Sequence, residues 1–164
     1  MSGEVMEALL AARALTEAVT PLRADCGRAC GHACCQPDET GRGGMLLFPG
    51  EEALYRDKAG FAVSRDGSLG IPALLLTCGG SCDRTERPLS CLIFPLLPKW
   101  KDGRVRVVRD RRGFEVCPLL PSGLGAFDPA FVDAVRAAGE LLYRVDAHRE
   151  FLDRIHGLIN AFAL

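Results

Sequence analysis

Eight cysteines are the residues of this sequence that could do chemistry. Four of them crowd into the short stretch DCGRACGHACC, and four more lie further along the chain. A thiolate sulfur is both a nucleophile and a soft ligand for zinc and iron, so the pattern points to metal binding or thiol redox chemistry. The candidate metal ligands are Cys26, Cys30, Cys34, Cys35, Cys78, Cys82, Cys91 and Cys117.

Glycines accompany the cysteines. Gly27 and Gly31 lie between the first cysteines, and Gly79 and Gly80 lie in the later motif TCGGSC. A chain that wraps around a metal needs unusual backbone angles, which glycine permits, and its N–H groups can then point at thiolate sulfurs. A polar, glycine-rich cysteine loop therefore favours ligation over ordinary core packing.

The expected compartment bears on what the thiols do. The N-terminal stretch lacks a basic opening, and Glu4 and Glu7 interrupt its apolar part, so it does not resemble a secretory signal. We therefore expect a cytoplasmic protein, in which structural disulfides are rare. Four disulfides are the rival interpretation if the protein is exported.

The adjacent pair Cys34–Cys35 constrains how ligands are shared. Side chains of consecutive residues diverge, so holding both on one ion, with Zn–S bonds of about 2.3 Å, would strain the loop. Either one cysteine ligates while its neighbour packs inward, or the two serve different metal atoms. Eight thiols permit two four-ligand sites without requiring them.

The motifs CGRACGHACC, TCGGSC and ERPLSCLIFPL together resemble a family of zinc- or iron-chelating domains of the CxxCxxCC type. The resemblance covers about positions 25 to 95. It implies a cysteine-bound metal, either zinc or an iron–sulfur cluster, and larger relatives include flagellin lysine methylases. The downstream part of the pattern is carried by Arg87, Pro88, Cys91, Phe94 and Pro95.

The spacing departs from that family, because three residues separate Cys26 from Cys30 and Cys30 from Cys34, where the family has two in at least one gap. Which of these cysteines ligate is therefore left open. His32 could replace a thiol, although a solvent-facing or hydrogen-bonding role is favoured. For Cys117, structural burial and ligation are equally weighted.

The spacing also bears on the metal. Two separated Cys-x-x-Cys knuckles, which are usual in zinc sites, are absent from the sequence. Repeated Cys-x-x-x-Cys spacing and the distant Cys117-Pro118 are more typical of cluster ligation. We therefore expect an iron–sulfur cluster, with zinc as the alternative.

The sequence predicts an α+β fold to position these thiols. We expect a small antiparallel sheet, cysteine-rich loops and helices at both termini. We expect a helix over 2–20, a loop over 25–44, and a short strand and helix in MLLFPGEEALYRD. Asp66-Gly67 and Asp102-Gly103 predict two hairpins, and a further strand is expected over 114–117.

The C-terminal region carries the strongest helical periodicity, as one long helix or two, since Asp146 could restart it. Asp128 and Pro129 suit its first positions. His148 and His156 are interpreted as surface groups, and Trp100 as a packing residue. In RVRVVRDRR, Arg104 and Arg106 should share the solvated strand face. The whole chain, 1–164, is expected to be one domain with a cysteine core over 25–118 and helices over 128–162.

Composition excludes some functions. The net charge of −1 makes nucleic acid an unfavoured partner, and no apolar run reaches the ~20 residues of a membrane span. We expect a metal-binding protein that acts in electron transfer, sensing or structure. Alternatives are a structural zinc protein that binds a protein partner, and, less favoured, a thiol or methylase-like enzyme. No residue is singled out as catalytic.

Overall fold

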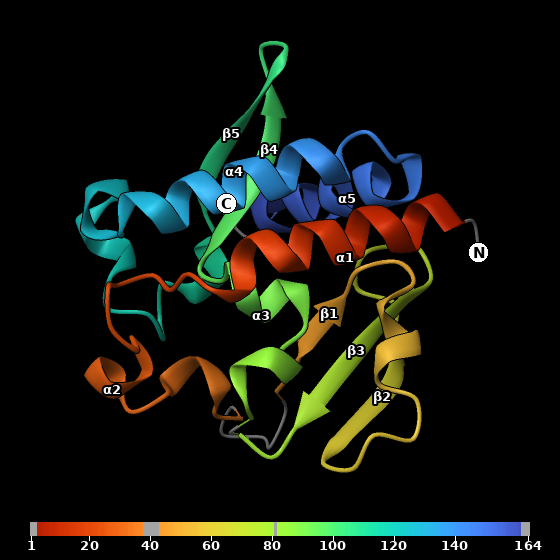
Figure 1. Ribbon diagram of the computed structural model, residues 1–164, viewed down its shortest axis with the longest axis horizontal. Helices are drawn as coiled ribbons and strands as arrows, with labels where there is room; N and C mark the ends of the chain where they lie inside the picture. Colours follow the sequence, from red (N-terminus) through yellow and green to blue (C-terminus); the bar gives the residue numbers. More distant parts are fainter. Residues whose placement is uncertain (1–2, 38–42, 81, 162–164) are drawn as a thin grey trace.

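The computed structural model describes residues 3–37, 43–80 and 82–161. Within these ranges the fold is α+β, as predicted, with helices at both ends and small antiparallel sheets between them (Figure 1). The helices are α1 (Gly3–Glu17), α2 (Gly27–Cys30), α3 (Leu89–Ile93), α4 (Pro129–Leu142) and α5 (Asp146–Ala161). The strands are β1 (Met45–Leu47), β2 (Phe61–Asp66), β3 (Ala73–Cys78), β4 (Leu96–Lys101) and β5 (Arg104–Arg109).

Two sheets replace the single sheet that the sequence predicted. The first has the strand order β1-β3-β2, antiparallel throughout, with Phe61 opposite Cys78 at its end. The second is the hairpin β4–β5, which projects above the helices in Figure 1. Both predicted hairpins are confirmed. In the second, Asp102 and Gly103 have φ of 54° and 74°, the left-handed pair that a tight two-residue turn requires.

The main core lies between the terminal helices, α3 and the second sheet. Helices α1 and α4 run side by side (Figure 1), and α4 also packs on the hairpin. Leu9, Phe131 and Leu152 are fully buried there. Gly139 lets α4 approach the hairpin closely, because a Cβ atom at this position would lie 2.3 Å from the Cβ of Pro98.

The C-terminal region is two helices. Asp128 caps α4 as predicted, accepting a hydrogen bond from the Ala130 N–H at 2.9 Å. A turn over 143–145 follows, and α5 begins at Asp146. The apolar periodicity therefore runs on through the sequence, but the turn divides it between α4 and α5. Phe162, Gly41 and Ser2, for which helix, loop and helix were predicted, lie outside the described residues.

Two predicted elements differ from the structure. No strand forms over 114–117: the N–H groups of Val116 and Cys117 both bond the Gly113 carbonyl, which makes a helical turn. The cysteine loop is also more ordered than predicted, since α2 and a 3₁₀ turn, η1 (Ala33–Cys35), lie within it. Helix α1 ends at Glu17, ahead of Pro21. Elsewhere, β1 is followed by the 3₁₀ turn η2 (Glu51–Leu54), at the position of the predicted helix.

The interpretation of His148 and His156 as surface groups is wrong. Both lie on the buried face of α5, and their Nε2 atoms pair with backbone carbonyls, at 2.9 Å from Val5 O and 2.8 Å from Pro98 O. Each imidazole can be buried because most of the ring packs as apolar surface and its Nε2 atom has a hydrogen-bond partner. Burial lowers the pKa of both rings.

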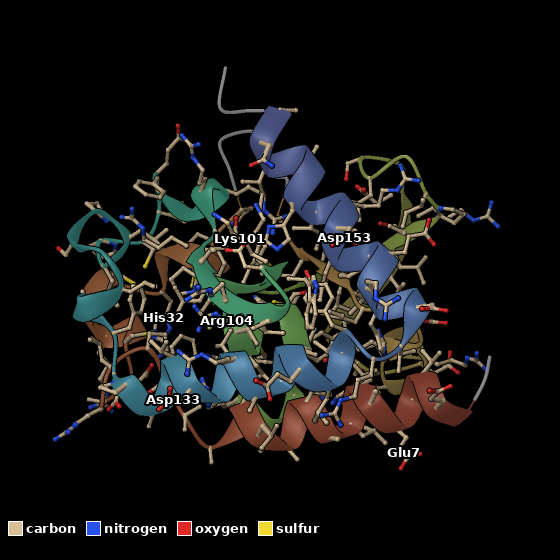
Figure 2. The ribbon with its side chains drawn as sticks, turned by 90° about the horizontal axis from the view of Figure 1, so that it is seen from above. Glu7, His32, Lys101, Arg104, Asp133 and Asp153 are labelled. Carbon is tan, nitrogen blue, oxygen red and sulfur yellow. The ribbon has the colours of Figure 1, made fainter. Side chains whose placement is uncertain are left out.

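The hairpin face is confirmed: Arg104 and Arg106 are exposed, and Val105 and Val107 are buried. Figure 2 shows Arg104 and Lys101 on this hairpin. Trp100 is 52% exposed, with its ring centroid 6.0 Å from that of Tyr143, so it packs on one side only. Within the ranges that the structure describes, no helix is both long enough and apolar enough to span a membrane.

Candidate metal centre

A cavity of about 340 Å³ lies where the end of the first sheet meets the cysteine turns and α3. Five cysteines line it, and four of them come from four different segments: one at the end of η1, one at the end of β3, one after the TCGG turn and one within α3. These are Cys35, Cys78, Cys82 and Cys91. We refer to them as the sheet-side thiols. Cys34 and Arg87 also line this cavity.

A second, smaller cavity of about 40 Å³ lies on the other side of Cys34. Its wall is mainly apolar and includes Leu22, Val116 and Leu119. Four cysteines line it, drawn from α2, from η1 and from the turn after β5: Cys26, Cys30, Cys34 and Cys117. We refer to these as the helix-side thiols. All eight cysteines of the chain thus border one or both of the two cavities, and none forms a disulfide.

The adjacent pair stands at the boundary between the cavities. Cys34 lines both, whereas Cys35 lines only the larger one. The thiol of Cys34 donates a hydrogen bond to the sulfur of Cys35, which lowers the pKa of Cys35 to about 6 and raises that of Cys34. The nearby charges of Arg87 and His32 lower the pKa of Cys35 further. Cys35 is therefore the more readily ionised thiol of the adjacent pair.

Arg87 supplies positive charge to the sheet-side thiols. Burial lowers the pKa of its guanidinium, but attraction to Cys35 and Cys82, the second also by a hydrogen bond, more than offsets this. Its Nε atom is buried and has no hydrogen-bond partner among the described residues. A cation facing several thiols favours their thiolate forms, which are the forms that bind metal.

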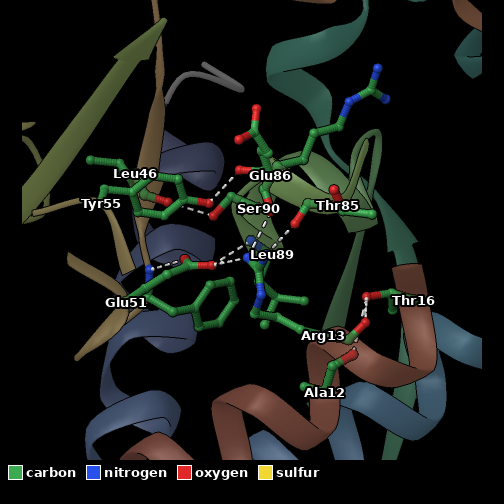
Figure 3. Close-up of polar contacts among 12 residues, drawn as sticks. Ala12, Arg13, Thr16, Leu46, Glu51, Tyr55, Thr85, Glu86, Leu89 and Ser90 are labelled. Carbon is green, nitrogen blue, oxygen red and sulfur yellow. Dashed lines mark hydrogen bonds and ion pairs between the residues drawn. The ribbon is translucent and has the colours of Figure 1, made fainter. Parts of the chain in front are cut away.

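A buried ion pair positions the segment that carries Arg87 and Cys91 (Figure 3). Glu51 is fully buried, and its carboxylate accepts hydrogen bonds from the Arg13 guanidinium and the Leu89 N–H, both at 2.7 Å. Arg13 also donates to the Arg87 carbonyl at 2.7 Å. Pro88, the N-cap residue of α3, has no side chain that can accept a hydrogen bond. Glu51, which comes from another part of the chain, accepts the hydrogen bond of the Leu89 N–H, which would otherwise be unpaired.

Arg84 joins the same segment to α1. Its guanidinium donates to carbonyls at the end of that helix, at 2.7 Å from Glu17 O and 3.2 Å from Thr16 O, and it also reaches Val19 O. A cation at a helix C-terminus is favourable because the unpaired carbonyls carry partial negative charge. The two arginines therefore have different positions: Arg87 lines the larger cavity, whereas Arg84 caps α1.

The turns around the helix-side thiols depend on two close approaches. A Cβ atom on Gly27 would lie 2.3 Å from Nδ1 of His32, so the imidazole rests against the first turn of α2. His32 lies among these turns (Figure 2) and lines neither cavity. A Cβ on Gly113 would lie 2.7 Å from Cζ of Phe94, the aromatic residue that lines both cavities.

The donor set fits a soft metal centre, since each cavity is bordered by four or more thiols and the larger one also by a cation. Given Zn–S bonds of about 2.3 Å, sulfurs around one zinc ion would lie roughly 3.8 Å apart. Within 3–37, 43–80 and 82–161, no three His, Cys, Asp or Glu side chains are already arranged to hold a metal ion.

Comparisons of the chain with protein-family models, with curated proteins and with solved structures found no match. The resemblance of the cysteine motifs to zinc- or iron-chelating domains therefore stays a prediction. Sequence reasoning did not find Phe94 as a wall shared by two cavities, or the role of Glu51. No spacing signal marks either residue, because both roles arise from contacts between distant segments.

Proposed function

We propose that this protein binds metal through its cysteines and carries an iron–sulfur cluster in the larger cavity. The observation that supports this most directly is the gathering of Cys35, Cys78, Cys82 and Cys91 beside the Arg87 guanidinium. The four thiols would hold the cluster, and the cation would offset part of their negative charge. The size of the cavity, about 340 Å³, exceeds what a single ion needs and favours a cluster.

When bound, such a cluster would supply one-electron chemistry, and the protein would act in electron transfer, in sensing or as a structural module. The part of this chain is to fix the ligands and their surroundings. Phe61, Leu76 and Phe94 give the cavity an apolar wall, and the surroundings of a cluster tune its reduction potential. A cytoplasmic location, where thiols stay reduced, belongs to the same proposal.

Metal analysis of the whole chain tests this function. Protein purified without oxygen should contain iron and sulfide in near-equal amounts and show broad visible absorption. Cys91→Ser and Cys78→Ser should lose most of both. The control is Ser122→Ala, a change of similar size at an exposed residue. A wild-type protein that holds neither iron nor sulfide after anaerobic reconstitution would refute the cluster.

Zinc is the alternative metal, because thiolates bind both. In that case the same preparation would be colourless and hold zinc, and chelation would unfold it, since structural zinc contributes directly to folding. The protein would then serve as an interaction module for a protein partner.

A further inference from the structure

The helix-side thiols, Cys26, Cys30, Cys34 and Cys117, form a group that the proposed cluster does not use. They come from α2, η1 and the turn after β5, whereas the sheet-side thiols come mainly from β3, the TCGG turn and α3. Phe94 and Cys34 both line the two cavities. The other seven cysteines each line one of them.

The two cavities differ in size and in their surroundings. The smaller has a volume of about 40 Å³ against about 340 Å³ for the larger. Arg87 lines only the larger one, and the wall of the smaller is built from side chains such as Leu22, Val116 and Leu119. A space of this size suits one metal ion with four sulfur ligands and is too small for a cluster of several iron and sulfur atoms.

The adjacent cysteines fit this division. Cys35 lines only the larger cavity, whereas Cys34 also lines the smaller one, so the adjacent thiols can serve different metal atoms. Each group then has four thiols: Cys34 completes the helix-side group, and Cys35 completes the sheet-side group. Four thiolates in a closed set are the usual ligands of a structural tetrahedral zinc ion.

We propose that Cys26, Cys30, Cys34 and Cys117 form a second, separate metal centre that holds a single tetrahedral divalent ion of the zinc type. This inference rests on the proposed function, because it takes the sheet-side thiols to be occupied by the cluster. The second centre joins α2 and η1 to the turn that follows β5. It thereby ties the cysteine turns to the main core, against which Cys117 packs.

Reciprocal cysteine variants test the division in the full chain, each group serving as the matched control for the other. Zinc, iron and sulfide are measured after anaerobic purification and reconstitution. Cys30→Ser and Cys117→Ser should lose the zinc equivalent and keep the iron and sulfide. Cys78→Ser and Cys91→Ser should lose the iron and sulfide and keep the zinc. Circular dichroism establishes that each variant retains the helices.

A titration of metal-free wild-type protein with Co²⁺ gives a measurement that needs no variant. Tetrahedral thiolate ligation of Co²⁺ produces intense visible absorption, so its end point counts thiolate sites. We expect two equivalents in wild type and one in Cys30→Ser and in Cys78→Ser.

Three results would distinguish a failure of this inference from a failure of the proposed function. One equivalent of metal, lost in all four variants alike, would show a single shared centre and overturn the inference. Iron and sulfide without a second metal would overturn the inference and leave the proposed function intact. A wild-type protein that binds no metal at all would overturn both.

Discussion

Arg13 and Glu51 form an ion pair in the interior, with 2.7 Å between Nη1 and Oε1 and with the carboxylate fully buried. Burial raises the pKa of Glu51 although Arg13 and two N–H groups, those of Leu89 and Phe48, favour its charged form. Burying this pair therefore costs desolvation free energy, and its structural role is to position α3. It connects α1 to the segment that carries Arg87 and Cys91.

Removing one partner of this pair should be costly. Glu51→Gln leaves the Arg13 charge buried without its counter-ion, so we expect a loss of about 3–5 kcal/mol in the free energy of unfolding. Denaturant titration measures it. The matched control is Glu140→Gln, on the exposed face of α4, which should change the free energy by less than about 0.5 kcal/mol. Equal effects of the two variants would contradict the assigned role of the pair.

Acid should destabilise the fold through His148 and His156. Their pKa values are lowered by burial, so the folded protein keeps both rings neutral while the unfolded chain binds protons near pH 6.5. Stability is therefore full above about pH 6.5 and falls as the pH drops below it, by up to about 1.4 kcal/mol for each pH unit of pKa depression.

Unfolding titrations at pH 7.5 and pH 5.5 measure this effect. The double variant His148→Gln, His156→Gln removes both titrating rings, and it should be less stable at pH 7.5 but less sensitive to acid. An acid response as large as that of wild type would assign the effect to other groups.

Two helix glycines should respond to alanine in opposite directions. A Cβ at Gly139 would lie 2.3 Å from Pro98 Cβ and 2.9 Å from Val105 Cγ1, so Gly139→Ala should destabilise by about 1–3 kcal/mol. A Cβ at Gly157 meets nothing within 4 Å, so Gly157→Ala should stabilise α5 by about 0.5–1 kcal/mol. Thermal unfolding of both variants measures the contrast, and a stabilising Gly139→Ala would be inconsistent with this packing.

The position of the Phe94 ring should depend on the absence of a side chain at Gly113. A Cβ at Gly113 would lie 2.7 Å from Phe94 Cζ and 2.9 Å from Leu120 Cδ1, so Gly113→Ala should shift the ring that lines both cavities. Under the proposed function, retention of iron and of the second metal should both fall. Gly125→Ala, with nothing within 4 Å of its Cβ, is the control. Unchanged retention of both metals in Gly113→Ala would argue against Phe94 as a shared wall.

The charge of Arg87 should matter for metal retention. Arg87→Met keeps an unbranched apolar stem but removes the cation that favours the thiolates of Cys35 and Cys82. We expect iron to be lost several-fold faster to a competing chelator. Arg28→Met removes an exposed cation from the cysteine turns and should lose iron at the wild-type rate. Similar rates for both variants would mean that the charge is not used.

The sequence predicted the elements whose signals are local. Asp-Gly pairs located both hairpins, and Asp128 with Pro129 located the start of α4, because turn and cap chemistry depends on adjacent residues. The prediction of a strand over 114–117 was wrong, because the N–H groups of Val116 and Cys117 bond the Gly113 carbonyl in a helical turn instead of pairing with another strand.

The sequence predicted which residues could form the candidate site, but not which of them lie together. Sequence reasoning selected all eight cysteines, since thiols crowded among glycines favour metal ligation over core packing. It allowed two sites of four without assigning members, because the assignment depends on which cavity each turn faces. The burial of His148 and His156 was missed because a histidine on a helix carries no sequence mark of the carbonyl that it will meet.

The order in which the sheet-side thiols occur along the chain has a consequence for biosynthesis. Cys35 emerges from the ribosome early, Cys78 completes the central strand of the first sheet, and Cys91 lies in a helix whose first N–H is held by Glu51. In the folded chain the paired sheet and α3 bring these thiols to one cavity. Under the proposed function, a complete set of sheet-side ligands therefore exists only after Cys91 has been synthesised.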